Sequence, residues 1–254
     1  MNILVLADLH YSNSDWNNVY KLRRVLEAQT PIQTSDLVLI CGDVFENTIR
    51  KTKFNPLELL YSLFQKEVIF CLGNHEFAYQ DYNNVLTYWK QFKHEHVHCL
   101  DVEGKAEFNG INFVGNVFWY DFTLGINRWV MQGEILNGWL DSTIQNFDPI
   151  QANLDCQKQI LDNLSNTLPN ILITHTVPHE KLNWFNFNDP NSPYNYYSGN
   201  KDFLKNLQNK NFLYSFSGHT HKRMTDEIYN IPCVNIGNDY YFKTETVNYY
   251  SFTL

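Results

Sequence analysis

Short apolar runs recur along the chain, and their length and content of β-branched residues predict buried strands. The five runs lie at residues 3–7, 37–41, 68–71, 171–174 and 212–216. Stretches with helical features follow the first three, at residues 16–29, 56–65 and 83–92, and the second of these begins with proline. Strands that alternate with helices predict right-handed crossovers and a mainly parallel sheet.

Two further regions contain alternating strands without long helices, at residues 106–118 and 223–254. Within the second region we expect strands at 228–230, 233–236 and 247–252. Together the two regions predict a second sheet that packs against the first. Residues 119–149 and 177–200 fit no regular element, and loops of this length in a compact domain are usually functional or disordered.

The length of 254 residues fits a single domain over residues 1–254. Hydrophobic residues make up 44% of the sequence, which suffices for a large core, but each apolar run is far too short to span a membrane. The first residues lead directly into an apolar strand, so we expect no secretion signal. The five cysteines include no CxxC pair, which predicts buried thiols in a reducing compartment, the cytoplasm.

The formal net charge of -8 disfavours a general nucleic-acid binder, which needs a basic surface to neutralise phosphates. Carboxylates that bind metal ions count toward this negative sum, and two divalent cations would add about four positive charges at their site. The charge therefore disfavours long DNA or RNA as a partner without excluding it.

Each of the five predicted strands ends in side chains that can bind a metal ion. The chain continues in turn as Asp8-Leu9-His10, Gly42-Asp43, Gly73-Asn74-His75-Glu76, His175 and Gly218-His219-Thr220-His221. Ligands bind at the carboxyl ends of the strands in open α/β sheets, so we expect these side chains in one crevice. Carboxylates mixed with imidazoles suit Mn, Fe and Zn, whereas Mg prefers a mostly oxygen shell.

Each motif alone has a purely structural alternative. An aspartate after a strand is often a helix or turn cap, and a buried histidine such as His175 can be a satisfied core residue. His219 and His221 are the strongest single signal, because two histidines that bracket one residue after a strand rarely serve packing. The metal-site prediction depends on the five motifs together.

In this order, the motifs D-x-H, G-D, G-N-H-E, H and G-H-T-H resemble the calcineurin-like metallophosphoesterase superfamily, from Asp8 to His221. The resemblance implies an α/β fold, a four-layer αββα sandwich of two mixed β-sheets flanked by helices. It also implies two divalent metal ions (Mn, Fe, Zn or Ni). The implied ligands are Asp8, His10, Asp43 and His221 for one ion, and Asp43, Asn74, His175 and His219 for the other. Asp43 would bridge the two ions.

The mechanism that the resemblance implies is two-metal hydrolysis of a phosphate ester. Both ions would lower the pKa of a bridging water, and the resulting hydroxide would attack phosphorus in line. His75 would lie just off the metals as a proton donor to the leaving alkoxide, or as a contact to a phosphate oxygen. His75 and Asp43 are therefore the predicted catalytic residues.

Candidates for substrate contacts are weaker, and each has a structural alternative. Residues 114–122 are similar to a bacterial and phage branch of predicted phosphohydrolases in the superfamily, with a Trp-x-Asp-Phe at the strand end. The candidates are Asn116, Tyr120, Arg128, His179 and Tyr197. The aromatic stretch 184–197 either overhangs the metals, where it would suit a nucleoside base, or packs on itself. His94, His96 and His98 are interpreted as a solvated strand start.

The sequence thus predicts a metal-dependent phosphodiesterase or phosphatase that acts on a small-molecule phosphate ester or a nucleotide, with no membrane partner. One alternative is a metal-dependent nuclease, although the chain has little room for a DNA-capping domain after His221. The other is a non-catalytic scaffold on the same fold, although the chain keeps His75 and every metal position.

Overall fold

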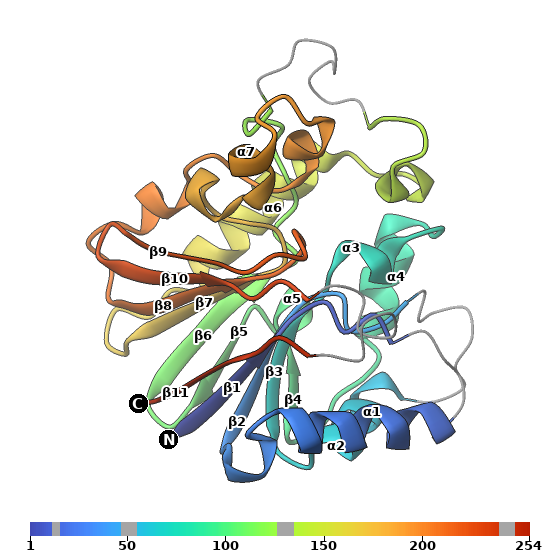
Figure 1. Ribbon diagram of the computed structural model, residues 1–254, viewed down its shortest axis with the longest axis vertical. Helices are drawn as coiled ribbons and strands as arrows, with labels where there is room; N and C mark the ends of the chain where they lie inside the picture. Colours follow the sequence, from blue (N-terminus) through green and yellow to red (C-terminus); the bar gives the residue numbers. More distant parts are fainter. Residues whose placement is uncertain (12–15, 47–54, 126–134, 239–246) are drawn as a thin grey trace.

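The computed structural model describes residues 1–11, 16–46, 55–125, 135–238 and 247–254, except for the side chains of residues 16–21, 186 and 187. The strands form two sheets (Figure 1). The five-stranded sheet has the order β11 (Tyr250–Thr253), β1 (Asn2–Leu6), β2 (Leu37–Cys41), β3 (Glu67–Cys71) and β4 (Val97–Cys99). The six-stranded sheet has the order β5 (Lys105–Phe108), β6 (Ile111–Asn116), β7 (Asn170–Thr174), β8 (Phe212–Ser217), β10 (Ile231–Asn235) and β9 (Met224–Ile228).

Both sheets are mixed, as predicted. The antiparallel pairs are β11 with β1, β5 with β6, and β9 with β10. The other pairings among the described strands, such as β1 with β2 and β6 with β7, are parallel.

The assignment of strands to sheets differs from the sequence pattern in two places. The pattern grouped β7 and β8 with the first three strands, but both belong to the six-stranded sheet. The cause is a helix that the sequence did not predict, α6 (Pro149–Asp162), which connects β6 to β7 as a crossover and packs on β6. Conversely, β11 was expected in the second sheet and pairs instead with β1.

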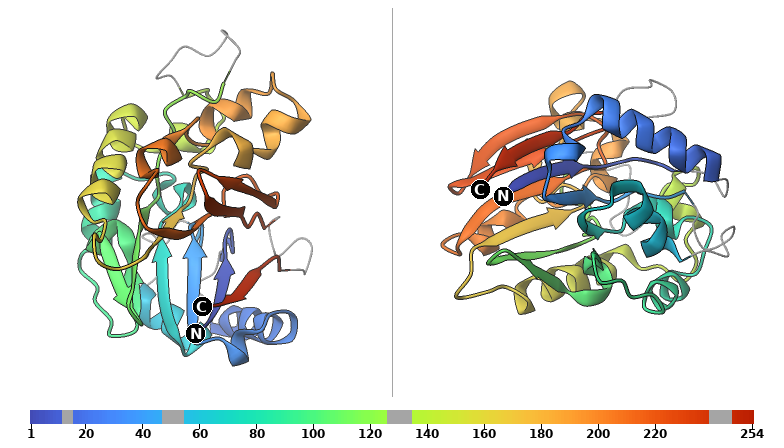
Figure 2. Two further views of the ribbon diagram at one scale, coloured as in Figure 1. Left: turned by 90° about the vertical axis from the view of Figure 1, so that its left-hand side faces the viewer. Right: turned by 90° about the horizontal axis from the view of Figure 1, so that it is seen from below.

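Longer helices cover the outer faces of the sheets and complete four layers, which confirms the predicted sandwich (Figure 2). The first sheet is covered by α1 (Trp16–Gln29), α2 (Pro56–Phe64) and α4 (Tyr82–Trp89), and the second by α6. The shorter helical segments are η1 (Ile32–Thr34), α3 (Asn74–Phe77), α5 (Leu100–Glu103), η3 (Leu140–Thr143), η4 (Glu180–Leu182), α7 (Trp184–Asn188), η5 (Pro193–Tyr197) and η6 (Phe203–Leu207).

The period of two along β1 produces both hydrophobic layers from one strand. Ile3 and Val5 are buried between the sheets in a cluster with Ile173 of β7. Leu4 points to the other face and belongs to the cluster that contains Leu60 of α2. A continuous apolar run is therefore needed, because β1 is buried on both faces.

Side-chain caps fix where two of the covering helices begin. Asn55 accepts a hydrogen bond from the Leu57 amide at 2.9 Å, directly before Pro56 at the first position of α2. Asp148 caps α6 in the same way and accepts from the amide of Ile150 at 3.0 Å. The Asn55 cap explains why α2 begins at the predicted residue, Pro56.

A buried carboxylate joins the two sheets beside the carboxyl ends of their strands. Asp101 of α5 accepts hydrogen bonds from the Leu72 amide, after β3, at 2.7 Å and from the Val117 amide, after β6, at 2.8 Å. Burial raises the pKa of Asp101 to about 7. The turns that follow β3 and β6 are therefore held in a fixed relation.

All five cysteines are buried and free, as the sequence predicted. Among the helices that the structure describes, none has the length and apolar character to cross a membrane.

Candidate metal centre

Many of the predicted metal-binding residues lie in strained turns just past the ends of strands. The backbone φ is positive at Asp8 (52°), His10 (46°), Asp43 (49°), His219 (69°) and His221 (55°). This left-handed region is unfavourable for residues other than glycine, and such strain is concentrated at functional sites. The chain therefore accepts a conformational cost at five places to turn these side chains toward one centre.

The glycines of the Gly-Asp and Gly-Asn motifs are required by close approach. A Cβ atom on Gly73 would lie 2.1 Å from Asp43 Oδ1. One on Gly42 would lie 2.3 Å from His175 Nδ1. At both turns the backbone comes so close to the side chain of a predicted ligand that only glycine fits.

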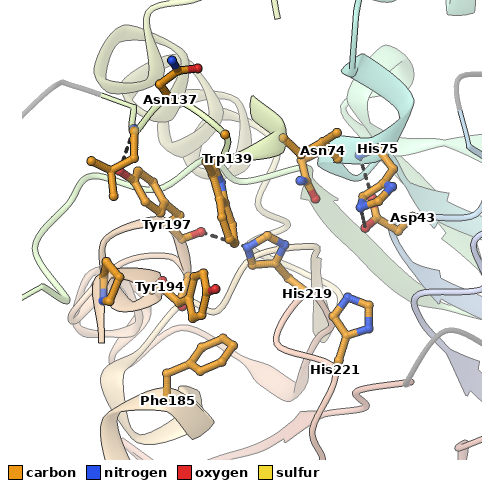
Figure 3. A pocket seen from close by; sticks show the side chains of 15 residues that line it. Asp43, Asn74, His75, Asn137, Trp139, Phe185, Tyr194, Tyr197, His219 and His221 are labelled. Atoms are coloured by element: carbon orange, nitrogen blue, oxygen red, sulfur yellow. Dashed lines mark hydrogen bonds and ion pairs between the residues drawn. The ribbon is translucent and has the colours of Figure 1, made fainter. Parts of the chain in front are cut away.

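One group of polar atoms converges on Nε2 of His175. Asn74 Oδ1 lies 3.0 Å from this nitrogen, and His219 Nδ1 lies 3.1 Å from it. Asp43 Oδ2 is 3.3 Å away. Figure 3 shows Asp43, Asn74 and His219 around the same space, although they come from different loops.

Outer hydrogen bonds determine which atoms of the two histidines face this space. Nδ1 of His175 is 3.0 Å from the Cys41 carbonyl, and Nε2 of His219 is 2.9 Å from the Tyr197 carbonyl. A carbonyl only accepts, so each of these outer nitrogens carries the proton. In the neutral rings, the inward nitrogens therefore present lone pairs to each other.

The amide of Asn74 is oriented in the same sense. Its nitrogen donates to Asp141 Oδ1 at 2.7 Å, which leaves Oδ1 of Asn74 pointing inward. With the carboxylate of Asp43, four electron-rich atoms thus face one point. Such an arrangement is stable only if positive charge lies among them, which is the requirement of a cation site.

The pKa values of His175 and Asp43 reflect the same requirement for positive charge beside the carboxylate. Burial lowers the pKa of His175, but the carboxylate of Asp43 raises it further, to about 10. Burial and the neighbouring His175 lower the pKa of His219 to about 3. Burial alone would raise the pKa of Asp43, yet the imidazoles around it, His175 first, hold it well below its usual range.

A second group consists of Asp8, His10 and His221, each of which offers one ligand atom within 4.8 Å of the others. Nδ1 of His221 donates to the Asn238 carbonyl at 2.6 Å, and Nδ1 of His10 lies 2.9 Å from Glu46 Oε1. With Nδ1 as the donor, Nε2 of each ring is left for a metal ion.

Asp43 lies between the two groups. Its Oδ2 atom is 3.3 Å from His175 Nε2 in one group and 3.7 Å from His10 Nε2 in the other. One carboxylate therefore faces both. The two clusters fit a dinuclear divalent site, and all seven predicted ligands belong to them.

His75 lies beside Asp43 and contacts a glutamate that the sequence analysis did not single out. His75 Nδ1 is 2.9 Å from Glu46 Oε1, and its Nε2 is 3.8 Å from Asp43 Oδ2. Burial lowers the pKa of His75, but Asp43 and Glu46 raise it to about 9. The hydrogen bonds from His10 and His75 in turn outweigh burial and lower the pKa of Glu46 to about 2. The position of Glu46, three residues after Asp43, is the one feature of the sequence that could have pointed to this residue.

Asp141 of η3 is the other functional candidate that sequence reasoning missed. Its Oδ1 accepts from Asn74, and its Oδ2 accepts from the Tyr120 hydroxyl at 2.9 Å and from Trp139 Nε1 at 3.0 Å. The residue is fully buried. No local signal marks it, because it lies 67 residues from Asn74 in a stretch that fits no regular pattern.

The predicted substrate contacts are dispersed. Asn116 is buried, and its amide nitrogen donates to Gln159 Oε1 at 2.6 Å, which ties β6 to α6. His179 accepts from the Lys181 amide at the start of η4. Tyr120 is buried against Asp141, and Arg128 lies outside the described residues.

A cavity of about 620 Å³ opens next to the predicted metal ligands. Asp43, Asn74, His75, His219 and His221 line one side of it (Figure 3). Of the five predicted substrate contacts, Tyr197 lines this cavity. The other four are not part of its described lining. The opposite side is built from residues 136–140 and from α7 and η5. Residues of the stretch 184–197 both line this cavity and pack on one another, as in the contact between Phe185 and Tyr194, so features of both predicted alternatives are present.

The family model described as calcineurin-like phosphoesterase matches residues 1–223. No curated protein matches the chain.

Among solved structures, the fold is similar to the phosphopantetheinyl hydrolase of Mycobacterium tuberculosis, with 14% identity, a TM-score of 0.63, and coverage of 98% of this chain and 95% of that one. It is also similar to a dimetal phosphatase from Danio rerio, with 14% identity, a TM-score of 0.50, and coverage of 93% and 87%. At these identities the likeness concerns the fold alone. The family match spans the strand ends that carry both clusters, and the chain belongs to the calcineurin-like phosphoesterase family, as a metal-dependent hydrolase of phosphoric esters.

Proposed function

We propose that this protein hydrolyses a phosphodiester or phosphomonoester bond of a small molecule or nucleotide. The observation that carries the proposal is the convergence of inward-facing acceptor atoms on both sides of Asp43. Such a pair of clusters requires cations, and a dinuclear centre is a common arrangement for phosphoryl hydrolysis.

The ligand sets we propose follow the two clusters. One ion would be held by Asp8, His10, Asp43 and His221, and the other by Asp43, Asn74, His175 and His219. The mixture of imidazole and oxygen ligands favours Mn, Fe, Zn or Ni over Mg. When bound, the pair of ions lowers the pKa of a water held between them and withdraws charge from the phosphoryl oxygens.

His75 has the position and charge for a general acid. It lines the cavity beside Asp43, and its raised pKa of about 9 favours the protonated ring at neutral pH. Glu46 holds Nδ1, so Nε2 is the nitrogen left to donate a proton to the departing alkoxide. A leaving group with a high pKa gains most from that proton.

The net charge and the cysteines bear on the kind of substrate and on the cellular location that we propose. The net charge of -8 favours a small substrate over long nucleic acid. The free, buried cysteines fit our expectation of a cytoplasmic location.

The test is hydrolysis by Mn-loaded protein of bis-p-nitrophenyl phosphate, p-nitrophenyl phosphate, cyclic nucleotides and linear single-stranded DNA. We expect turnover of small esters and little of DNA. Asp43→Ala should abolish activity on all of them, and His75→Ala should retain metal but slow hydrolysis by roughly 100-fold or more. Degradation of DNA in preference to small esters would make the protein a nuclease, and no turnover with any metal would make it a scaffold.

A further inference from the structure

The cavity has a second side, made of aromatic rings, that the hydrolytic chemistry does not use. Four residues form this aromatic wall: Trp139, Phe185, Tyr194 and Tyr197. The rings of Trp139 and Tyr197 stack with centroids 5.0 Å apart and planes inclined by 22°. Tyr194 packs against Trp139 at 5.3 Å and against Phe185 at 5.4 Å. Figure 3 shows these rings across the cavity from Asp43 and His75.

Three hydrogen bonds fix the aromatic wall relative to the predicted metal ligands. Trp139 Nε1 donates to Asp141 at 3.0 Å, and the same carboxylate accepts from Asn74 at 2.7 Å. The carbonyl of Tyr197 accepts from His219 Nε2 at 2.9 Å. A group bound on the wall is therefore held at a defined offset from a phosphate on the metals, which is what positioning of a substrate requires.

Part of the wall offers flat apolar surface to solvent: Tyr194 is exposed and Trp139 and Phe185 are partly exposed, whereas Tyr197 is buried and packs behind Trp139. Tyr194 is 48% exposed, among the most exposed large hydrophobic side chains of the described residues. Asn137 and Ser198 also line the cavity and supply polar groups. The described lining contains no lysine or arginine, so its recognition surface suits an uncharged flat group better than a second phosphate.

We propose that the aromatic wall binds the base of a nucleoside phosphate ester whose phosphate occupies the metal centre. This inference rests on the proposed hydrolysis for the position of the phosphate. A cavity of about 620 Å³ has the volume of a site for a ligand of this size. Stacking on the accessible rings of Trp139, Phe185 and Tyr194 would tolerate different bases, because every base has a π-face.

Binding tests the inference without any need for turnover. Mn-loaded protein is titrated with adenosine 5′-monophosphate and with ribose 5-phosphate, which lacks the base, in a calorimeter. The nucleotide should bind about tenfold more tightly. Tyr194→Leu should remove most of that difference, whereas Tyr79→Leu, which removes a similarly exposed tyrosine outside the cavity lining (46% against 48%), should not.

Turnover provides the second readout, with adenosine 2′,3′-cyclic phosphate and the corresponding cyclic phosphate of methyl riboside followed by phosphorus NMR. The two diesters differ in the base alone, so the inference predicts about tenfold higher kcat/KM for the first. Tyr194→Leu should lower kcat/KM for the nucleotide and leave the riboside unchanged.

The two proposals can fail separately. Base-dependent binding that needs Tyr194, in a protein that hydrolyses no ester, would uphold the aromatic wall and refute the hydrolysis. Hydrolysis of bis-p-nitrophenyl phosphate, combined with equal binding of nucleotide and ribose phosphate, would refute the wall alone. Equal binding by wild type and Tyr194→Leu would refute it as well.

Discussion

Among individual residues, those that hydrogen-bond to the predicted metal ligands determine which ligand atoms face the candidate site. Each inward-facing atom is fixed by an outer hydrogen bond, such as the one from His175 to the Cys41 carbonyl. Glu46 contacts both His10 and His75 and so couples a proposed ligand to the proposed acid. Outer partners of this kind commonly change metal affinity or activity by 10- to 100-fold when they are replaced.

Replacement of Glu46 by glutamine keeps the shape of the side chain and removes its charge. We expect kcat to fall about 10- to 100-fold while the metal content, measured by mass spectrometry, stays near two ions. The charge of Glu46 helps to raise the pKa of His75 to about 9. An acid is active below its pKa, so the basic limb of the pH–rate profile should move to lower pH.

The matched control for this change is Glu107→Gln, an exposed glutamate on β5. It should leave both kcat and the pH profile as they are in the wild type. A Glu46→Gln protein with an unchanged basic limb would contradict the contact that we assign to His75.

Asp141→Asn should weaken metal binding about 10- to 100-fold. One oxygen of Asp141 accepts from Tyr120 and Trp139 together, and an amide nitrogen at that place would face two donors. If the amide instead turns its nitrogen toward Asn74, the orienting hydrogen bond is lost.

We also expect Asp141→Asn to lower the free energy of unfolding by about 1–3 kcal/mol. Calorimetric titration of the metal-free protein with Mn measures the first effect and urea unfolding the second; unchanged affinity would refute the orienting role.

At the scale of elements, the histidines at the start of β4 have a structural role. His98 Nε2 lies 3.0 Å from Glu67 Oε1 of β3, and its Nδ1 lies 2.9 Å from Glu103 Oε2 of α5. Among the described residues, no group of metal-ligating atoms forms around His94, His96 or His98. The contacts of His98 instead connect β3, β4 and α5 at the edge of the five-stranded sheet.

This contact makes the stability of the β3–β4–α5 unit depend on pH. The hydrogen bond to Glu103 raises the pKa of His98, against an opposing effect of burial. A raised pKa contributes stability that is complete below the unfolded value of about 6.5 and lost as pH rises through the folded value. His98→Gln should therefore destabilise the protein at about pH 6 by up to about 1 kcal/mol, because the side chain is partly exposed and its ion pairs are screened by solvent, and by less at about pH 9.

Urea unfolding of wild type and His98→Gln at both pH values measures this difference. Comparison of the two proteins at each pH removes the titration of the remaining histidines. An equal loss at the two pH values would mean that the ion pairs of His98 contribute nothing to stability.

At the scale of the whole molecule, the two sheets meet at the candidate site. Asp8, Asp43 and Asn74 follow strands of the five-stranded sheet, and His175 and His219 follow strands of the six-stranded sheet. Metal ions held between them would cross-link the sandwich at this end. Asp101 already connects the sheets through backbone amides next to the site.

Removal of the metals should therefore lower the stability of the entire fold. A ligand that binds the native state alone stabilises it by about 2.7 kcal/mol at 100 times its dissociation constant. We expect a higher calorimetric unfolding temperature in Mn than in chelator for the wild type and for the surface variant Asp155→Asn. Asp43→Ala should lose most of this shift, and an equal shift in that variant would refute the proposed bridge.

Sequence alone was enough to predict five of the strands, with boundaries within one residue, and the five motifs that follow them. The expected strand at 228–230 was wrong, because these residues lie at the end of β9 and in the turn between β9 and β10. Apolar runs buried on both faces leave a local record, and so do glycines at turns without room for a side chain, such as Gly42 and Gly73. The ordered motifs were sufficient for the family and for the two-sheet sandwich, both of which are confirmed. The ligand roles of the individual residues stay predictions.

The tertiary structure alone decided which strands share a sheet and which residues support the site. β11 lies beside β1 although almost the whole chain separates them, and Asp141 meets Asn74 across 67 residues. It also placed Asn116 against α6 and the aromatic wall across the cavity from Asp43 and His75 (Figure 3). Local periodicity records which face of an element is buried. Pairing between strands and hydrogen bonds between distant side chains depend on the packing of the complete fold, so no window of sequence contains them.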